Sequence, residues 1–524
     1  MLTAVSRIRS KTKELKIMAD GHSVAWPRSK EQQHTRQRPE HCIEQQIDQP
    51  TKWLTDHCTE QRADQADHRT DHCTEQRADH ADHRIDHCIV QQTESRAGAS
   101  LARLFSWTLI GNVVYAACQW AMLVVLAKFG SPEDVGIFSL ALALTAPVYL
   151  LTNFQLRGIL ATRTKPNKRE TDPGSRRKLE ELGTGTYVGF RIVSSCTALL
   201  ISLLLAVCGG YSAQVCKAIV LVTCAKTIEA ICDIVYGWWQ QHEKMRWSAT
   251  SLLLRGVFSF VVFGAIYVWT GQLIPALVGY AVVWLLVLLL HDLPRAKRIE
   301  GFGVSWKTAE WGSLLRYCWP MGAVMMIVSL QSNVPRYFIS HVYGNEELGY
   351  FSALMYVMVA GTTIISAIGQ SASPRIAQLY ASGDKKGLIY LLRRMIWLIG
   401  GGSFLLLLAV ILAGKPLLTL LYNASYAAYQ DMFAWITVAS SIGYAASLYG
   451  FALTAARKFW SQFMVSLVVL GVLLAYTWLS IIFEGGTIHA AYALVCANIV
   501  QFIGSAWLLR KSIRECEFMK QLGV

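Results

Sequence analysis

The sequence predicts an all-α polytopic membrane protein with about twelve transmembrane helices, preceded by a disordered amino-terminal tail. Apolar residues make up 53% of the 524 residues and charged residues only 16%. From Leu104 onward, apolar stretches of about 19–26 residues recur, long enough to cross a hydrocarbon core about 30 Å thick at 1.5 Å per residue. Lys and Arg are concentrated in every second connector between these stretches, which is typical of membrane insertion.

Each predicted span is an apolar stretch bounded by polar or turn-forming residues. We place the twelve spans at about 104–128, 135–156, 187–208, 214–239, 248–268, 273–291, 317–341, 348–372, 395–413, 431–454, 461–483 and 488–509.

The basic connectors predict the orientation. Connectors 157–186, 240–247, 292–316, 373–394 and 455–460 hold 8, 2, 5, 5 and 2 Lys or Arg, and the tail from Arg510 holds 4. The opposite connectors hold only Lys415, with Lys128 and Lys217 near helix ends. Because Lys and Arg are retained in the cytoplasm, we expect a bacterial inner (plasma) membrane protein with both termini cytoplasmic. The net charge of +14 then reflects topology and contacts with anionic lipids rather than nucleic-acid binding.

Residues 1–100 form a separate predicted region of low complexity. Thr55–Arg69 (TDHCTEQRADQADHR) and Thr70–Arg84 (TDHCTEQRADHADHR) are near-identical repeats of 15 residues. Few apolar residues and dense charge favour disorder. The recurring His-Cys pairs are too far apart in sequence for a usual zinc site, so we expect no metal. An alternative is that residues 1–97 are upstream sequence and that the native chain starts at Val90 or Leu101.

Catalytic motifs are missing from the sequence. No GxxxxGK[ST], GxGxxG on a strand, HExxH or GxSxG pattern is present, so nothing indicates nucleotide-driven or hydrolytic chemistry. The predicted outer loops, such as Gly209–Ala213 and Thr270–Gln272, are too short for a catalytic domain. We therefore expect a protein that is not an enzyme and has no cofactor.

Four segments resemble polysaccharide flippases of the multidrug/oligosaccharidyl-lipid/polysaccharide exporter superfamily. They are Leu126–Leu144 (LAKFGSPEDVGIFSLALAL), Asn333–Tyr356 (NVPRYFISHVYGNEELGYFSALMY), Gln370–Asp384 (QSASPRIAQLYASGD) and Leu420–Tyr429 (LLYNASYAAY). The resemblance covers about Leu101 to Leu509. It implies two six-helix lobes around a central cavity, alternating access, and export of a lipid-linked oligosaccharide.

An internal repeat supports the two lobes independently. FGSPEDVGIFSLAL after the first span and VYGNEELGYFSALM after the seventh share a pattern, and Gly136 and Gly349 occupy equivalent positions 213 residues apart. Transporters often build alternating access from repeated halves. We therefore expect an amino-terminal lobe at 101–300, a carboxy-terminal lobe at 301–510 and a cytoplasmic tail at 511–524.

The fourth span holds the densest set of charges, Lys226, Glu229 and Asp233. Their spacing places them on one face of a helix. A charge inside a span costs about 2.5–3.5 kcal/mol on insertion scales, so such groups normally face a polar cavity or a partner. We predict that Lys226 meets an anionic substrate and that Glu229 or Asp233 binds a coupling ion. The alternative is a self-neutralising stripe that only permits packing.

Four arginines complete the candidate set. Arg336 follows Pro335 and lies about 9 Å from the outer end of the seventh span, where it could bind a pyrophosphate bidentately or extend to the outer headgroups. Arg255 and Arg157 are further predicted substrate contacts. The alternative for Arg255 is extension to the membrane interface, and Arg157 also contributes to the basic charge of the inner connector. Arg191, about one turn into the third span, is expected to extend its guanidinium to the membrane interface.

The predicted function is to flip a polyprenyl-pyrophosphate-linked oligosaccharide across the inner membrane for a surface polysaccharide such as the O-antigen of lipopolysaccharide. Predicted partners are this substrate, membrane lipids, and a polysaccharide polymerase with its export machinery. One alternative is a multidrug/cation antiporter of the same superfamily, which a net cationic cavity disfavours. A membrane glycosyltransferase or polymerase is a further alternative, which the short outer loops disfavour.

Overall fold

A computed structural model describes residues 107, 109–161, 182–456, 458–483 and 485–521. These residues belong to one compact unit, Gln92–Val524. The predicted disordered tail at 1–100, with its repeats and its alternative start sites, lies outside the described residues. So does the central part of the most basic connector.

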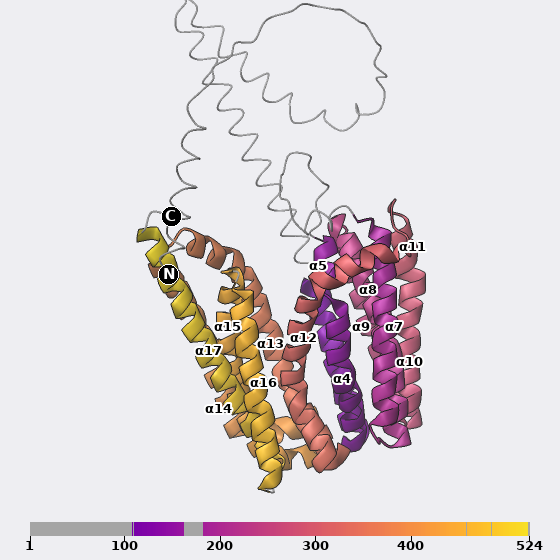
Figure 1. The fold of residues 1–524 in the computed structure, drawn as a ribbon. Coiled ribbons are helices and arrows are strands. Elements are labelled where there is room, and N and C mark those ends of the chain that lie inside the picture. Colours follow the sequence, from indigo (N-terminus) through magenta and orange to yellow (C-terminus); the bar gives the residue numbers. More distant parts are fainter. Residues whose placement is uncertain (1–106, 108, 162–181, 457, 484, 522–524) are drawn as a thin grey trace, which may run out of the picture. The chain divides into compact units, whose positions relative to one another are not determined.

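Every regular element in the described residues is a helix, which confirms the all-α prediction (Figure 1). The first described helix is Leu109–Phe129. It is followed by α4 (Pro132–Asn153), α5 (Leu156–Ala161), α7 (Thr184–Cys208), α8 (Ala213–Gln241), α9 (Met245–Thr270), α10 (Leu273–Val287), the π-helical turn η1 (Leu288–Asp292), α11 (Leu293–Lys297), α12 (Thr308–Val342), α13 (Gly344–Ala381), α14 (Lys385–Leu421), the 3-10 turn η2 (Ala424–Tyr429), α15 (Gln430–Ala455), α16 (Phe459–Ile482) and α17 (Ile488–Gln521).

Eleven helices in the described part of the chain are long and apolar enough to cross a membrane. The remaining predicted span corresponds to α8, which has 29 residues but carries four charged side chains that lower its hydropathy. It nevertheless lies among the spans, because it packs on α4, α5, α7 and α10. The protein is therefore a multi-pass membrane protein, with eleven apolar spans and one charged span among the described residues.

Several helices extend beyond their predicted spans. Helices α12, α13 and α14 have 35, 38 and 37 residues, whereas the apolar stretches predicted only 317–341, 348–372 and 395–413. Helix α14 is kinked at Ala413, where φ is −127° and ψ is 20°, so the end of its predicted span coincides with the kink. Hydropathy detects only the apolar part of a helix, and these helices continue through polar residues.

The second predicted span, 135–156, is interrupted near its end. Phe154 and Gln155 adopt φ angles of 50° and 52°, a left-handed conformation that is uncommon for residues other than glycine. Helix α4 therefore ends at Asn153 and α5 restarts at Leu156. Because α5 packs on α8, the break carries Arg157 toward the charged face of α8.

The helices form two groups joined by α4, α12 and α13 (Figure 1). Helix α8 packs on α4, α5, α7 and α10 in the first half, whereas α15 packs on α13, α14 and α17 in the second half. Both α12 and α13 pack extensively on α4. We call the helix ends beside connectors 157–186, 240–247, 292–316, 373–394 and 455–460 the basic end.

The two copies of the internal repeat lie against each other at the opposite end of the helices. A Cβ atom added to Gly136 would lie 1.8 Å from the carbonyl oxygen of Asn345, and one added to Gly349 would lie 1.8 Å from that of Pro132. Each contact is the counterpart of the other under the 213-residue offset, as in a two-fold symmetric interface. Only glycine allows the two backbones to approach this closely.

Hydrogen bonds between the halves accompany this close approach. The Ser139 hydroxyl donates to Ser352 Oγ at 2.6 Å, again between residues 213 apart. Asn423, in the turn before η2, donates through Nδ2 to the carbonyl oxygen of Ala127 at 3.0 Å. The halves are thus joined by complementary contacts at the end opposite the basic connectors.

Candidate functional site

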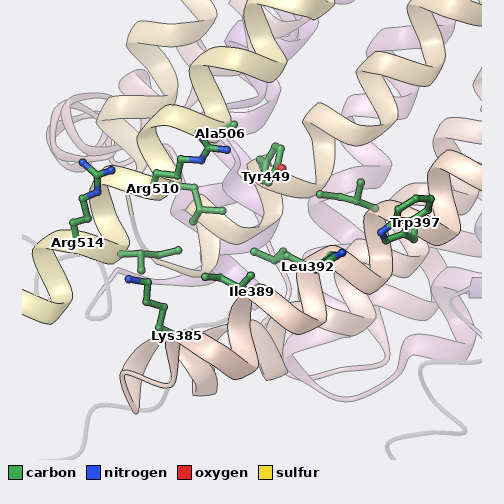
Figure 2. Close-up of a pocket in the computed structure, with 12 residues that line it drawn as sticks. Lys385, Ile389, Leu392, Trp397, Tyr449, Ala506, Arg510 and Arg514 are labelled. Carbon is green, nitrogen blue, oxygen red and sulfur yellow. The ribbon is translucent and has the colours of Figure 1, made fainter.

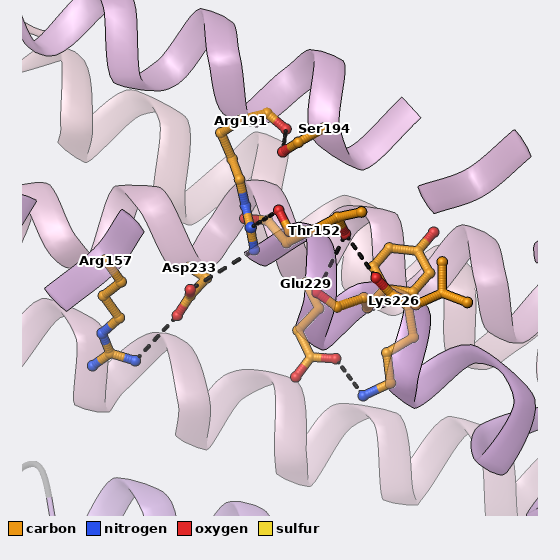
Figure 3. A network of polar contacts seen from close by, with 10 residues as sticks. Thr152, Arg157, Arg191, Ser194, Lys226, Glu229 and Asp233 are labelled. Atoms are coloured by element: carbon orange, nitrogen blue, oxygen red, sulfur yellow. Dashed lines mark hydrogen bonds and ion pairs between the residues drawn. The ribbon is translucent and has the colours of Figure 1, made fainter. Parts of the chain in front are cut away.

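The charged face of α8 is the starting point of the candidate site (Figure 3). Lys226 Nζ lies 2.6 Å from Glu229 Oε2, and their side chains are 26% and 37% exposed. The spacing of three residues places both on one helix face. These two residues therefore form a half-exposed ion pair near the middle of the helix.

Asp233 lies one turn further toward the basic end and contacts two arginines (Figure 3). Arg157 Nη1 is 3.3 Å from Asp233 Oδ1, and Arg191 Nη2 is 3.8 Å from Asp233 Oδ2. The side chains of Arg157 and Asp233 are 35% and 21% exposed, whereas that of Arg191 is 4% exposed. One carboxylate is thus shared by an accessible guanidinium and a buried one.

Arg191 is the residue that sequence reasoning misplaced. Its Nε donates to the carbonyl oxygen of Ala230 at 2.7 Å, and Nη1 donates to that of Thr152 at 3.4 Å. The expectation that its guanidinium extends to the membrane interface is therefore wrong. The packing of α7 on α8 brings the guanidinium to Ala230 and Asp233. The break at Phe154 accounts for the bond to Thr152, because the last carbonyl groups of a helix lack intrahelical donors.

The cluster of Arg157, Arg191, Lys226, Glu229 and Asp233 holds three cations and two carboxylates. We call it the α8 cluster. Because charged groups facing hydrocarbon cost about 2.5–3.5 kcal/mol each, its exposed parts must face water or a polar ligand. A guanidinium carries five N–H donors, and Asp233 engages only Nη1 of Arg157. The accessible face of the α8 cluster therefore offers donors and one excess positive charge.

Arg255 lies in a second, enclosed group of charges. It forms a buried ion pair with Asp292, whose other oxygen lies 2.8 Å from His291 Nδ1. Its guanidinium lies 5.3 Å from the centre of the Tyr236 ring, and that of Arg157 lies 5.4 Å from the same ring. Arg255 and Arg157 of the α8 cluster thus contact the same Tyr236 ring. The side chain of Arg255 is only 2% exposed, so it is enclosed, unlike that of Arg157.

Arg336 lies on α12, apart from both groups. Its Nη1 donates to Asn333 Oδ1 at 2.7 Å, and its guanidinium lies 5.8 Å from the centre of the Tyr356 ring. Helix α12 continues through Pro335 as one helix. None of the contacts among the described residues joins Arg336 to the α8 cluster. The structure therefore brings Arg157, Lys226, Glu229 and Asp233 together, adds Arg191, and leaves Arg255 and Arg336 separate.

The fold is shared with solved transporters. The chain is 13% identical to the lipid II flippase MurJ in an inward closed conformation, with a TM-score of 0.61, covering 78% of this chain and 90% of MurJ. It is 13% identical to an inward-facing multidrug resistance transporter of the MATE family in the MOP superfamily, with a TM-score of 0.58 and coverage of 77% and 95%. The MATE transporter VcmN of Vibrio cholerae gives a TM-score of 0.53 at 13% identity, with coverage of 80% and 97%.

Sequence comparison gives the family. The capsular polysaccharide biosynthesis protein CapF of Staphylococcus aureus is 22% identical over 416 residues, covering 78% of this chain and 100% of CapF. The family model described as "Polysaccharide biosynthesis protein" matches residues 101–380, which is more than half of the chain. The predicted resemblance is confirmed, and the protein belongs to the polysaccharide biosynthesis protein family.

Proposed function

We propose that this protein flips a lipid-linked oligosaccharide, with a polyprenyl-pyrophosphate carrier, across the bacterial inner membrane for surface polysaccharide biosynthesis. The observation that carries the proposal is the partly exposed α8 cluster, with three cations and two carboxylates inside the helical bundle. Membership of the polysaccharide biosynthesis family and a fold shared with a lipid II flippase support it.

The α8 cluster has the chemistry to receive a pyrophosphate. Arg157 is the most accessible of its arginines and keeps N–H donors beyond the one that Asp233 engages. A guanidinium binds phosphate oxygens bidentately. In this proposal the anionic headgroup binds Arg157 and Lys226, Arg191 stays in place as a support, and the lipid tail remains in the bilayer.

The two carboxylates are the proposed coupling sites. Neutralising Asp233 by a proton would raise the excess charge of the α8 cluster from one to two, which favours an anionic headgroup. Glu229 would act in the same way beside Lys226. Net direction in this scheme comes from an ion gradient or from consumption of the product downstream.

Alternating access follows from the joined end of the halves. We place the basic end in the cytoplasm with both chain termini, on the basis of the charge distribution. The contacts between Gly136 and Asn345 and between Ser139 and Ser352 then close the outer side, and the substrate enters from the cytoplasm. Release on the outer side requires these contacts to separate.

The second candidate function is a drug/cation antiporter, because multidrug transporters share the fold. The excess positive charge of the α8 cluster disfavours cationic drugs. Because the predicted outer loops are too short for a catalytic domain, we propose a carrier rather than a glycosyltransferase or polymerase.

The experiment that tests the proposal is deletion of the gene in its host, with complementation by the wild-type gene. We expect loss of the surface polymer and accumulation of lipid-linked units in the inner leaflet, both reversed by complementation. Normal polymer together with altered drug tolerance would overturn the flippase in favour of the antiporter.

A further inference from the structure

A second polar site lies on the other half of the molecule, at the basic ends of α14, α15 and α17 (Figure 2). It is a cavity of about 490 Å³. Lys385 and Arg393 of α14 and Arg510 and Arg514 of α17 line it, and none of its described lining residues is a carboxylate. Figure 2 shows Lys385, Arg510 and Arg514 toward one end of the cavity and Trp397 toward the other.

No described carboxylate neutralises the arginines of this cavity. Among the described residues, Arg393, Arg510 and Arg514 form no ion pair with a carboxylate. This differs from the α8 cluster, where each cation has a carboxylate nearby. The cavity therefore presents three guanidinium groups to an anion supplied from outside.

A second, apolar cavity lies next along the same three helices. The basic cavity itself is also lined by the apolar side chains of Leu392 and Leu509. The second cavity is a groove of about 590 Å³, lined mostly by apolar side chains, among them Phe404, Ile442 and Ile503, together with Ser403 and Ser441. Helices α14 and α17 each pack on α15 and hardly on each other, which leaves the space between them open.

The length of the groove fits a membrane lipid. From Lys385 at the basic end to Phe404, α14 advances 19 residues, or about 28 Å at 1.5 Å per residue. Built Cβ atoms on Gly400, Gly401 and Gly402 would meet nothing within 4 Å, so this stretch of α14 leaves room beside it. Polarity changes along the groove from guanidinium to aliphatic, as it does along a phospholipid from headgroup to acyl chain.

We propose that this groove binds an anionic phospholipid from the leaflet at the basic end. Its phosphate would be held by Arg393, Arg510 and Arg514, and an acyl chain would lie along α14 and α17. Guanidinium groups bind phosphate bidentately, and basic pockets between spans on the cytoplasmic side bind anionic headgroups. Trp397 is 71% exposed beside the cavity, as expected for an aromatic side chain that contacts lipid. The site is separate from the α8 cluster and does not depend on the proposed substrate.

The test is lipid binding to the purified full-length protein, measured by native mass spectrometry and by melting temperature in detergent. We expect phosphatidylglycerol to bind and raise the melting temperature, and phosphatidylcholine to do neither. Inorganic phosphate and a short-chain phosphatidylglycerol should bind more weakly than the long-chain lipid, because they leave the apolar groove unfilled. Equal effects of phosphatidylcholine, or of phosphate alone, would overturn the proposal.

Paired charge removals provide the control. Arg510→Gln with Arg514→Gln should weaken phosphatidylglycerol binding by about thirtyfold, at roughly fivefold per basic residue. Lys386→Gln with Arg394→Gln removes the same charge from exposed positions of α14 that do not line the cavity, and should leave binding unchanged. Equal losses in both pairs would mean that only the general positive charge of this end attracts the lipid.

Discussion

At Asp233 a single carboxylate serves two arginines with different surroundings. Arg157 is 35% exposed, whereas Arg191 is 4% exposed and donates to two backbone carbonyl groups. Burial decides what each guanidinium can do: an enclosed one holds helices together, and an accessible one can exchange its carboxylate for a ligand. The same ion-pair network thus combines a structural role with a binding role.

Substituting these two arginines separates the roles. Arg157→Ala should abolish most surface polysaccharide and change stability by less than about 1 kcal/mol, since partly exposed ion pairs contribute little. Arg191→Ala should destabilise the protein by about 1–3 kcal/mol, because carbonyl groups of α4 and α8 lose their buried donor. Polymer yield and melting temperature in detergent measure the two effects. Similar melting temperatures for both variants would contradict the assigned roles.

Lys226 and Arg336 remain the other predicted substrate contacts. Lys226→Ala and Arg336→Ala should each weaken export while the protein still folds, because both side chains are partly exposed and neither joins two helices through a buried ion pair. Lys217→Ala, at an exposed position on α8 outside the α8 cluster, is the matched control. Surface polysaccharide is measured beside membrane expression level. If a variant still produces normal surface polysaccharide, its residue is not a substrate contact.

At the scale of the helix, the π-helical turn η1 carries Asp292 into the sixth span. The predicted span ended at 291, so Asp292 was assigned to the following connector. In the structure the helix continues through η1 into α11, and Asp292 is fully buried beside Arg255 of α9. This ion pair holds α9 against the π-helical turn. Arg255 also contacts the ring of Tyr236, which belongs to α8, so the pair connects α9 and η1 to α8 as well.

Breaking this pair should be costly. Asp292→Asn leaves the Arg255 charge buried without a counterion, and loss of one partner of a buried pair typically costs about 3–5 kcal/mol. We expect a large fall in melting temperature in detergent. The double variant Arg255→Met with Asp292→Leu should recover part of the loss, because no charge then remains unpaired. A double variant as unstable as the single one would show that packing, not charge, governs this position.

The accuracy of prediction from sequence differs between elements for physical reasons. Spans and the charged face of α8 follow from local apolar and helical periodicity, so they were predictable. The break at Phe154 has no glycine or proline signal at that position, and without it the partners of Arg191 could not be inferred. Arg255 is a predicted substrate contact because it lies inside the fifth span. Its partner Asp292 lies 37 residues away, and only tertiary packing brings the two together, so the pair could not be predicted from the sequence.

At the scale of the whole transmembrane unit, the repeat that indicated two halves also forms part of their joint. Gly136 and Gly349 are equivalent in sequence, and each faces the partner segment of the other. At these two positions the contact is between backbones, because glycine has no side chain. The hydrogen bond between Ser139 and Ser352 is then a contact that must break whenever the halves separate.

Cross-linking this joint tests whether its opening is required for export. In the double variant Ser139→Cys with Ser352→Cys, the two sulfur atoms should lie near enough to form a disulfide, since the hydroxyl oxygens are 2.6 Å apart. Oxidation should stop export of the polysaccharide unit, and a reductant should restore it. Each single cysteine variant, treated in the same way, controls for the native cysteines. Full export by a protein shown to be cross-linked at these positions would mean that the joint stays closed during transport, and that the substrate leaves by another route.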